Sequence, residues 1–522
     1  MSFVKIVSAR EAANLLKTGM TVATEGFLGI QVADEIFLGI RERFLEEGLP
    51  RDLTLFHIAS QGDFSNEKGL CRLAEEGLLK RVIGAHFNTM PKLRDMLSEN
   101  KIEGFNLPQG VISHMMRDIA AHKPGTITHV GLKTFVDPRL EGAKVNQKAR
   151  DSGYDPVELI HLGGKEYLWY KPVRPDACIL RGSYADERGN ISFEKEVATL
   201  STVSVAQATR NSGGIVIVQV ERIVGAGTLD PKLVKIPGIY VDYVVVARPE
   251  NHRQTYAVDY DPAFTGHIRV PVSSIPPLKL DERKVIARRA AMELVPRAVV
   301  NLGVGMPEGV AIVATEEGIA HHMNLTVESG PVGGVPAGGG SFGAATNPEA
   351  ILDQGYQFDF YDGGGIDVAF LGIGQCDAKG NINVSRFGTR SPGCGGFINI
   401  TQNSKKVVFC GNFTAGGVQL EIGNGKLTIR KEGKVHKFIP AVEQITFSGE
   451  YAKEVAQPVV YITERAVFEM KPEGFALTEI APGIDLQKDV LDQMDFQPII
   501  AKELKRMDER IFREEKMGIT LI

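Results

Sequence analysis

One glutamate, Glu328, has the surroundings that covalent carboxylate chemistry needs. It closes a short β-favouring run that begins at Asn324, and residues 329–340 after it read Ser-Gly-Pro-Val-Gly-Gly-Val-Pro-Ala-Gly-Gly-Gly. A loop with this much glycine does not continue as a helix, and its backbone amides are not shielded by side chains. A carboxylate at such a strand end is placed to meet a substrate. Amides within hydrogen-bonding reach could stabilise the oxyanion of an acyl group on it.

Two other interpretations of Glu328 stay open on these residues alone. In the first, Glu328 is a solvated strand end that turns into a loop. In the second, residues 298–302 form a strand, the glycine-rich turn 303–309 opens a helix, and Glu328 closes the next strand. That is about where the acidic residue of a dinucleotide-binding fold holds a ribose.

Composition narrows the class of protein. With 522 residues, 43% hydrophobic and 24% charged, the chain has ordinary globular proportions and room for two or three domains. A net charge of −5 without a basic cluster argues against nucleic acid as a partner. The five cysteines show neither CxxC nor metal-ligand spacing, no apolar run reaches membrane-spanning length, and the amino terminus lacks a signal-peptide core. We therefore expect a cytoplasmic protein with reduced thiols, without a metal and without membrane attachment.

The chain repeats itself at a constant offset. Residues 176–191 match residues 367–382 at an offset of 191, and both copies contain Asp-x-x-Gly-Asn-Ile. The same offset superimposes residues 215–218 on residues 406–409 without a gap. We expect two homologous domains, at 1–268 and 282–522, joined by an extended proline-rich linker at 269–281.

Each half alternates short apolar runs with helical patterns. Residues 21–23, 53–56, 179–180 and 216–218 predict buried strands, while 33–44 and 93–100 predict helices. Alternation of this kind predicts an α/β fold: two Rossmann-like domains with mainly parallel sheets. The charged run at 502–516 predicts an amphipathic helix.

Several long motifs, in order along the chain, resemble the family I CoA-transferases, most closely their acetate/propionate branch. In the second half these are Asn301–Pro307, Thr326–Gly340, Asp359–Gly365, Gly380–Gly388, Gly395–Gln402 and Phe409–Gly417, and in the first half Gly182–Ile191 and Val234–Gly238. The resemblance implies the CoA-transferase fold over the whole chain, in a homodimer or homotetramer. It also implies that no metal or permanently bound cofactor is needed, because a coenzyme A thioester is itself a substrate.

The same resemblance implies roles for individual residues. Glu328 would be the nucleophile that forms a glutamyl-CoA thioester. Backbone amides at Val304, Asn412 and Gly416 would bind CoA and the oxyanion, and Gln109 would position the carboxylate substrate. Without the resemblance, Gln109 is equally well a loop glutamine that bonds its own backbone.

The expected reaction moves CoA between a short-chain acyl-CoA and a carboxylic acid by a ping-pong mechanism. Acetate, propionate, butyrate, lactate and 3-oxo acids are all compatible with the sequence. A hydrolase that admits water to the same intermediate is the nearest alternative. An NAD-dependent dehydrogenase fits less well, since it predicts a helix where the glycine-rich loop stands. A non-catalytic binding protein would be expected to lack the carboxylate.

Overall fold

The computed structural model describes residues 4–271 and 277–521. The chain forms two compact units, and each unit is assembled from three separate stretches of the sequence. The first comprises Met1–Val270, Val327–Asp359 and Phe387–Asn399, and the second comprises Pro271–Thr326, Phe360–Arg386 and Ile400–Ile522. The predicted limits of the two homologous domains remain a prediction, and residues 272–276 of the predicted linker lie outside the described residues.

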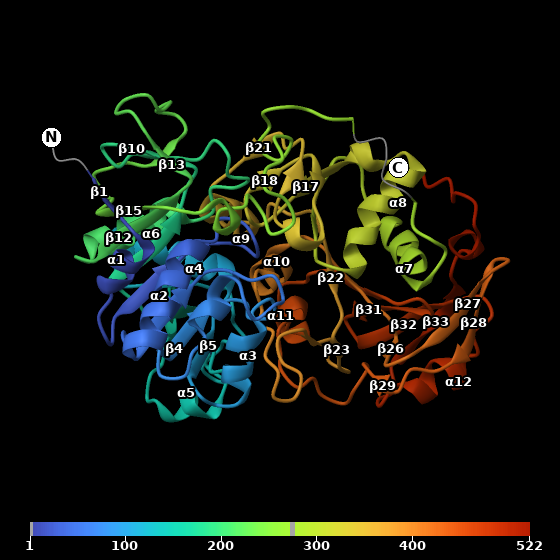
Figure 1. Cartoon of the computed structure of the whole chain (residues 1–522). Helices are drawn as coiled ribbons and strands as arrows, with labels where there is room; N and C mark the ends of the chain where they lie inside the picture. Colours follow the sequence, from blue (N-terminus) through green and yellow to red (C-terminus); the bar gives the residue numbers. More distant parts are fainter. Residues whose placement is uncertain (1–3, 272–276, 522) are drawn as a thin grey trace. The chain divides into compact units, whose positions relative to one another are not determined.

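The first unit is built on an eight-stranded, fully parallel sheet, whose strands lie in the blue-to-green part of the chain in Figure 1. In spatial order the strands are β1 (Lys5–Val7), β15 (Tyr243–Val246), β12 (Ile215–Val220), β9 (Ala177–Arg181), β2 (Thr21–Thr24), β3 (Leu53–His57), β4 (Leu79–Gly84) and β5 (Glu103–Asn106). From β2 the chain runs outward through β3, β4 and β5, and it later returns to β9 on the other side of β2. The order therefore reverses between β2 and β9, which is where open α/β sheets bind ligands, at the carboxyl ends of the strands.

The helices of this unit follow the predicted alternation. The principal ones are α1 (Ala9–Asn14), α2 (Asp34–Glu47), α3 (Pro91–Ser98), α4 (Gln109–Ala120) and α6 (Thr202–Asn211), and α5 (Gln147–Asp151) is shorter. Ser8 caps α1 in a reciprocal capping box with Glu11, and α2 ends at Gly48 in the left-handed region at φ 69°. The helices predicted at 33–44 and 93–100 are thus confirmed as α2 and α3.

The second unit contains eight strands of a mixed sheet. Their order is β17 (Met323–Thr326), β16 (Ala298–Leu302), β22 (Val368–Gly372), β25 (Val407–Cys410), β30 (Val459–Ile462), β31 (Ala466–Lys471), β32 (Gly474–Ile480) and β33 (Ile499–Arg506). The strands from β17 to β30 are parallel, and β31 and β32 continue as an antiparallel hairpin. Its main helices are α7 (Glu282–Ala291), α8 (Gly309–Glu317) and α11 (Gly449–Glu454). The α/β fold with mainly parallel sheets is confirmed.

The repeat seen in the sequence reappears in the backbone at the same offset. Strands β9, β10 (Tyr184–Asp186) and β11 (Ile191–Ser192) correspond to β22, β23 (Gln375–Cys376) and β24 (Ile382–Asn383). In the first copy Asn190 Nδ2 donates to Asp186 Oδ2 at 2.9 Å, and in the second Asn381 Nδ2 donates to Asp377 Oδ2 at 3.0 Å. The duplicated motif therefore encodes the same hydrogen-bonded turn twice.

One sequence prediction is wrong. The run 502–516 was expected to be an amphipathic helix, but Ile499–Arg506 is strand β33, paired in parallel with β32, and only Glu509–Phe512 forms a short 3-10 helix. Along β33 most side chains are exposed, so the charges lie on an edge strand that needs few buried residues. Charged residues on an edge strand also oppose pairing with another chain.

Candidate active site

Glu328 lies in a tight turn directly after β17. The Gly330 amide donates to the Val327 carbonyl at 2.9 Å, and the Val327 amide donates to the Pro331 carbonyl at 2.9 Å. Gly330 has φ 132°, and a Cβ there would lie 2.2 Å from the Leu352 carbonyl oxygen. Only glycine fits this position, and the turn holds the half-buried Glu328 between two fixed neighbours.

The loop after Glu328 packs against the β2–α2 loop of the same unit. Ser329 is fully buried, and its hydroxyl donates to the Gly343 carbonyl at 2.6 Å. Phe342 stacks on Phe27 with ring centroids 5.9 Å apart, and a Cβ on Gly343 would lie 2.5 Å from the Phe27 ring. The segment that carries Glu328 is thereby tied to the carboxyl end of β2.

Gln109 lies in the same unit, at the first position of α4. Its side chain is 2% exposed, and Nε2 has no hydrogen-bond partner among the described residues. Its backbone amide donates to the Gly395 carbonyl at 3.0 Å, and the next amide, of Gly110, donates to Asn399 Oδ1 at 3.1 Å. Gln109 is therefore a buried residue with a spare donor, rather than a loop glutamine satisfied by its own backbone.

The other three predicted residues belong to the second unit. Val304 follows β16 and is exposed, Asn412 follows β25, and Gly416 follows β26 (Thr414–Ala415) with φ 85°. Since β16, β22 and β25 are parallel neighbours, Val304 and Asn412 lie at the same edge of this sheet. Asn412 Oδ1 is buried and has no hydrogen-bond partner within the described part of the chain.

No α-helix follows β17 in the described chain until α9 (Gln354–Asp362). Residues 329–343 instead contain the short strands β18 (Pro331–Val332) and β19 (Val335–Pro336) and a 3-10 turn at Gly339–Ser341. A dinucleotide site would need a helix directly after this strand. The arrangement therefore disfavours the ribose-binding interpretation of Glu328.

Comparison with known proteins agrees with this geometry. Residues 6–247 match the family model described as coenzyme A transferase. The caffeate CoA-transferase of Acetobacterium woodii is 50% identical over 99% of this chain and 99% of its own. The chain belongs to the coenzyme A transferase family. Acetate CoA-transferase YdiF of Escherichia coli O157:H7 is 43% identical over 99% of this chain and 97% of its own.

The solved structures of YdiF have the fold of this coenzyme A transferase. The apoenzyme from E. coli O157:H7 matches with a TM-score of 0.94, covering 99% of this chain and 98% of that one. YdiF as a thioester complex with CoA matches with a TM-score of 0.92 over the same shares. The predicted family, fold and enzyme class are thus confirmed.

Two charged residues of this coenzyme A transferase, Lys437 and Glu25, were not predicted from the sequence. Lys437 follows β29 (Val435–His436), and its Nζ lies 3.1 Å from where a Cβ on Gly411 would be, next to Asn412. Burial lowers the Lys437 pKa to about 8, against the opposing influence of Glu464. Lys437 belongs to no recognisable motif, so nothing in the sequence singles it out.

The second missed residue is Glu25, and its sequence surroundings resemble those of Glu328. It directly follows β2 and precedes Gly26, just as Glu328 follows β17 and shortly precedes a glycine. Glu25 is 1% exposed, and burial raises its pKa well above the ordinary value. A carboxylate at a strand end before glycine was the pattern that identified Glu328.

Burial shifts the pKa of other reactive side chains in this enzyme. All five cysteines are free and buried, and burial raises the pKa of the Cys178 thiol to about 12. Burial also lowers the pKa of His57 and of His86 to about 4, so both imidazoles are neutral at pH 7. Within the described residues no cluster of histidine, cysteine and acidic side chains could hold a metal, and no helix is long and apolar enough to cross a membrane.

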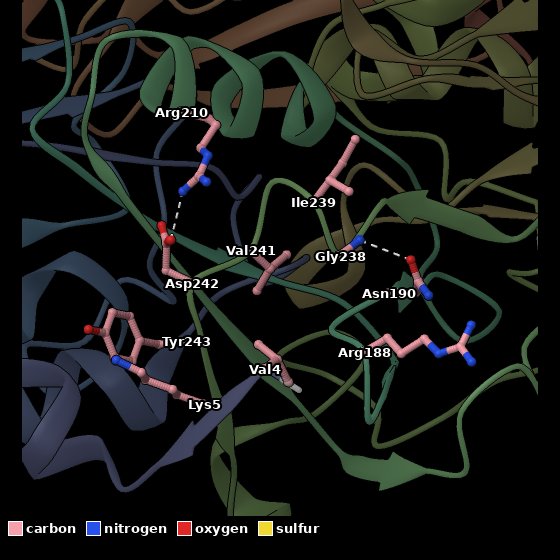
Figure 2. A pocket seen from close by; sticks show the side chains of 10 residues that line it. All are labelled: Val4, Lys5, Arg188, Asn190, Arg210, Gly238, Ile239, Val241, Asp242 and Tyr243. Carbon is pink, nitrogen blue, oxygen red and sulfur yellow. Dashed lines mark hydrogen bonds and ion pairs between the residues drawn. The ribbon is translucent and has the colours of Figure 1, made fainter. Parts of the chain in front are cut away.

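A cavity of about 540 Å³ lies elsewhere in the first unit (Figure 2). Lys5 and Tyr243, two of its lining residues, begin the parallel strands β1 and β15, so the cavity opens at the amino-terminal edge of the sheet. Arg210 and Asp242 form an ion pair of 2.7 Å on its wall. It includes none of the predicted site residues, which follow the carboxyl ends of strands.

Proposed function

We propose that this coenzyme A transferase exchanges CoA between a short-chain acyl-CoA, of acetyl, propionyl or butyryl type, and a carboxylic acid such as acetate, through a glutamyl-CoA thioester on Glu328. The observation that carries the proposal is the placement of Glu328 in a glycine-bounded turn at a strand end. The existence of YdiF as a thioester complex with CoA supports the same chemistry here.

The proposed reaction begins when a Glu328 carboxylate oxygen attacks the thioester carbonyl carbon. The carbon–sulfur bond breaks, CoA leaves as a thiolate, and a mixed anhydride remains. The thiolate then attacks the glutamyl carbonyl carbon, and the first acid leaves as its carboxylate. A second carboxylate reverses both steps and departs as a new acyl-CoA. One negative charge is passed along throughout, so neither a net proton nor ATP is required.

A carboxylate is a weak nucleophile, so the rest of the site must lower the barrier. Val304, Asn412 and Gly416 are proposed to bind CoA and the developing oxyanion, at about 3–4 kcal/mol for each well-placed donor. Gln109 is proposed to orient the acid with its unpartnered Nε2. Binding of the distant parts of CoA adds positioning energy. Water must be excluded, since it would hydrolyse the anhydride.

We further propose a cytoplasmic homodimer or homotetramer that holds no permanent cofactor, in which residues 1–268 and 282–522 are the two duplicated domains. The homologous turns at Asp186 and Asp377 support the duplication.

The test is to trap the intermediate. The protein is incubated with propionyl-CoA without an acceptor acid, digested at mildly acidic pH, and searched by mass spectrometry for CoA on the peptide that contains Glu328. CoA on Glu328, absent from Glu328→Ala, is expected. An unmodified Glu328 with intact propionyl-CoA would reject the nucleophile, and rapid loss of propionyl-CoA without acceptor would indicate a hydrolase.

A further inference from the structure

Glu25 occupies the position where the first unit's sheet reverses its strand order. It follows β2 directly, and β2 lies beside β9 at the reversal. Both of its carboxyl oxygens are buried, and among the described residues only the backbone amides of Gly26 and Ser201 act on them, with no side-chain partner. A buried carboxyl with so few polar neighbours is costly, so its presence at the point where the strand order reverses calls for an explanation.

Two buried glutamines flank Glu25, and each has an unused amide donor. A Cβ on Gly26 would lie 2.8 Å from Gln61 Cγ, so the Gln61 side chain lies against the residue after Glu25. Gln354 Oε1 accepts hydrogen bonds from Ser113 Oγ at 2.9 Å and Ser201 Oγ at 3.4 Å. The Nε2 atoms of Gln61 and Gln354 have no partner in the described structure.

The orientation of Gln354 is fixed by these two serines, because its oxygen must face both hydroxyls. The amide of one of them, Ser201, also acts on Glu25. Gln354 is therefore linked to Glu25 through a single residue, while Gln61 is linked to it through Gly26.

Gln109 adds a third unused amide donor to the first unit. The atoms nearest to a Cβ placed on Gly395 would be Gln109 Oε1 at 3.8 Å and His86 carbons at 3.9 and 4.0 Å. These are ordinary contact distances, so a group the size of a methyl would fit beside the Gln109 side chain without overlap. The Glu328 loop reaches the same side of the unit through the contact of Gly343 with Phe27.

Within the described part of the chain, no charged side chain shifts the pKa of Glu25. Burial raises its pKa, and only the backbone amides of Gly26 and Ser201 oppose that effect. Burial therefore favours the protonated carboxyl group, which can donate one hydrogen bond. The amide donors of Gln61 and Gln354 lie close to this carboxyl group. A ligand that complements them is a small group with several acceptor lone pairs, and a carboxylate has about four.

We propose that Glu25 donates a hydrogen bond to the carboxylate of the acid substrate, beside the amide groups of Gln61, Gln109 and Gln354, and thereby determines the enzyme's affinity for the acid. The inference rests on the proposed function. A neutral acid at this position binds an anion, whereas an ionised one would repel it. Glu25 is thus a specificity-determining residue, distinct from the nucleophile Glu328.

The experiment compares two near-isosteric variants. Glu25→Gln keeps a donor without charge, and Glu25→Met removes the donor at similar volume. Initial rates are measured with butyryl-CoA and varied acetate or propionate. We expect Glu25→Gln to keep a KM for the acid close to that of the wild type. Glu25→Met should raise that KM by about tenfold or more, because the carboxylate loses a partner in a buried site.

Glu196 provides the matched control. It is a second buried glutamate of the same unit, but it is paired with Arg181 at 3.2 Å. Glu196→Gln should leave the KM for the acid unchanged, and circular dichroism should verify that all three variants are folded. An unchanged KM in Glu25→Met, or an equal rise in Glu25→Gln and Glu25→Met, would overturn the proposal.

Failure of this inference is distinguishable from failure of the proposed function. After long incubation with butyryl-CoA alone, the wild type should carry CoA on Glu328 irrespective of what Glu25 does. If the adduct forms and the KM for the acid is the same in the wild type and in Glu25→Met, only the inference fails. If the wild type forms no adduct, the proposed function itself is rejected.

Discussion

Ser329 donates its hydroxyl proton to the carbonyl oxygen of Gly343 across 2.6 Å, and this bond closes the loop that begins at Glu328. The bond is buried, and it fixes the residue next to the proposed nucleophile. Because small displacements of a reacting group are costly in rate, this contact should matter more for turnover than for stability.

Ser329→Ala should reduce kcat by about tenfold and destabilise the fold by only about 1 kcal/mol. Ser341→Ala is the control. Ser341 belongs to the same loop as Ser329, and its Oγ also makes a buried hydrogen bond, of 2.9 Å to Thr255 Oγ1. Steady-state kinetics and urea unfolding of both variants test this. Equal kcat losses in the two variants would show that the Ser329 bond has no special role beside Glu328.

Gly330→Ala should be severely destabilising. Its Cβ would lie 2.2 Å from the Leu352 carbonyl oxygen at φ 132°, a combination of backbone strain and overlap that we expect to cost about 2–5 kcal/mol. Gly339→Ala is the matched comparison, because φ is 58° there and nothing lies within 4 Å of the added Cβ. Thermal unfolding should show a much larger loss for Gly330→Ala, and similar losses would contradict the turn geometry.

The pH dependence of stability should report the buried carboxyl of Glu25. Its pKa is raised on folding, so above about pH 4.5 the unfolded state releases a proton that the folded state keeps. The contribution of Glu25 to stability is therefore complete below that pH and declines as the pH rises towards the folded-state pKa. Glu25→Gln should remove the decline and be more stable than the wild type at pH 8. Parallel unfolding curves of the two proteins from pH 5 to 8 would show that Glu25 is ionised in the fold.

Lys437 should impose an alkaline limit on the use of acyl-CoA. With a pKa lowered to about 8 by burial, its ammonium loses the proton well below the range of an ordinary lysine. We expect kcat/KM for acyl-CoA to fall above about pH 8 in the wild type, because the Gly411–Asn412 loop then loses its neighbouring positive charge. In Lys437→Met the value should be lower at pH 7 and flat across pH 8. A fall above pH 8 that persists in Lys437→Met would assign it to another group.

The duplicated turns offer a test of equivalence. Asn190 Oδ1 accepts from the Gly238 amide at 2.9 Å, and Asn381 Oδ1 accepts from the Gly449 amide at 2.9 Å. Asn190→Ala and Asn381→Ala remove the same set of bonds and should each cost about 1–3 kcal/mol in urea unfolding. A cost confined to one of them would mean that the two copies no longer share the role of this turn.

The sequence predicted what depends on local patterns. The strand and helix alternation and the repeat at an offset of 191 residues foretold the parallel sheets, because both follow from hydrophobic periodicity and turn chemistry. The strand end and the glycine turn at Glu328 were predicted for the same reason, since they are adjacent in the chain.

Long-range neighbours could not be predicted in this way. Gln354 meets Ser113 and Ser201 only after folding, and Lys437 approaches Gly411 from a loop without a motif. The strand at Ile499–Arg506 was mistaken for a helix, because its charges look helical until its place at the edge of the sheet is known. Burial, which sets the pKa values of Glu25 and Lys437, is a property of the assembled structure.

The discontinuous first unit has a consequence for how the protein is made. That unit includes Val327–Asp359 and Phe387–Asn399, which a ribosome synthesises long after β2 and α2. Gly343, which lies against Phe27 and Ile30, belongs to this later segment. A nascent chain must therefore present this apolar surface throughout the translation of the intervening residues, and a polypeptide stopped after residue 270 would leave it uncovered.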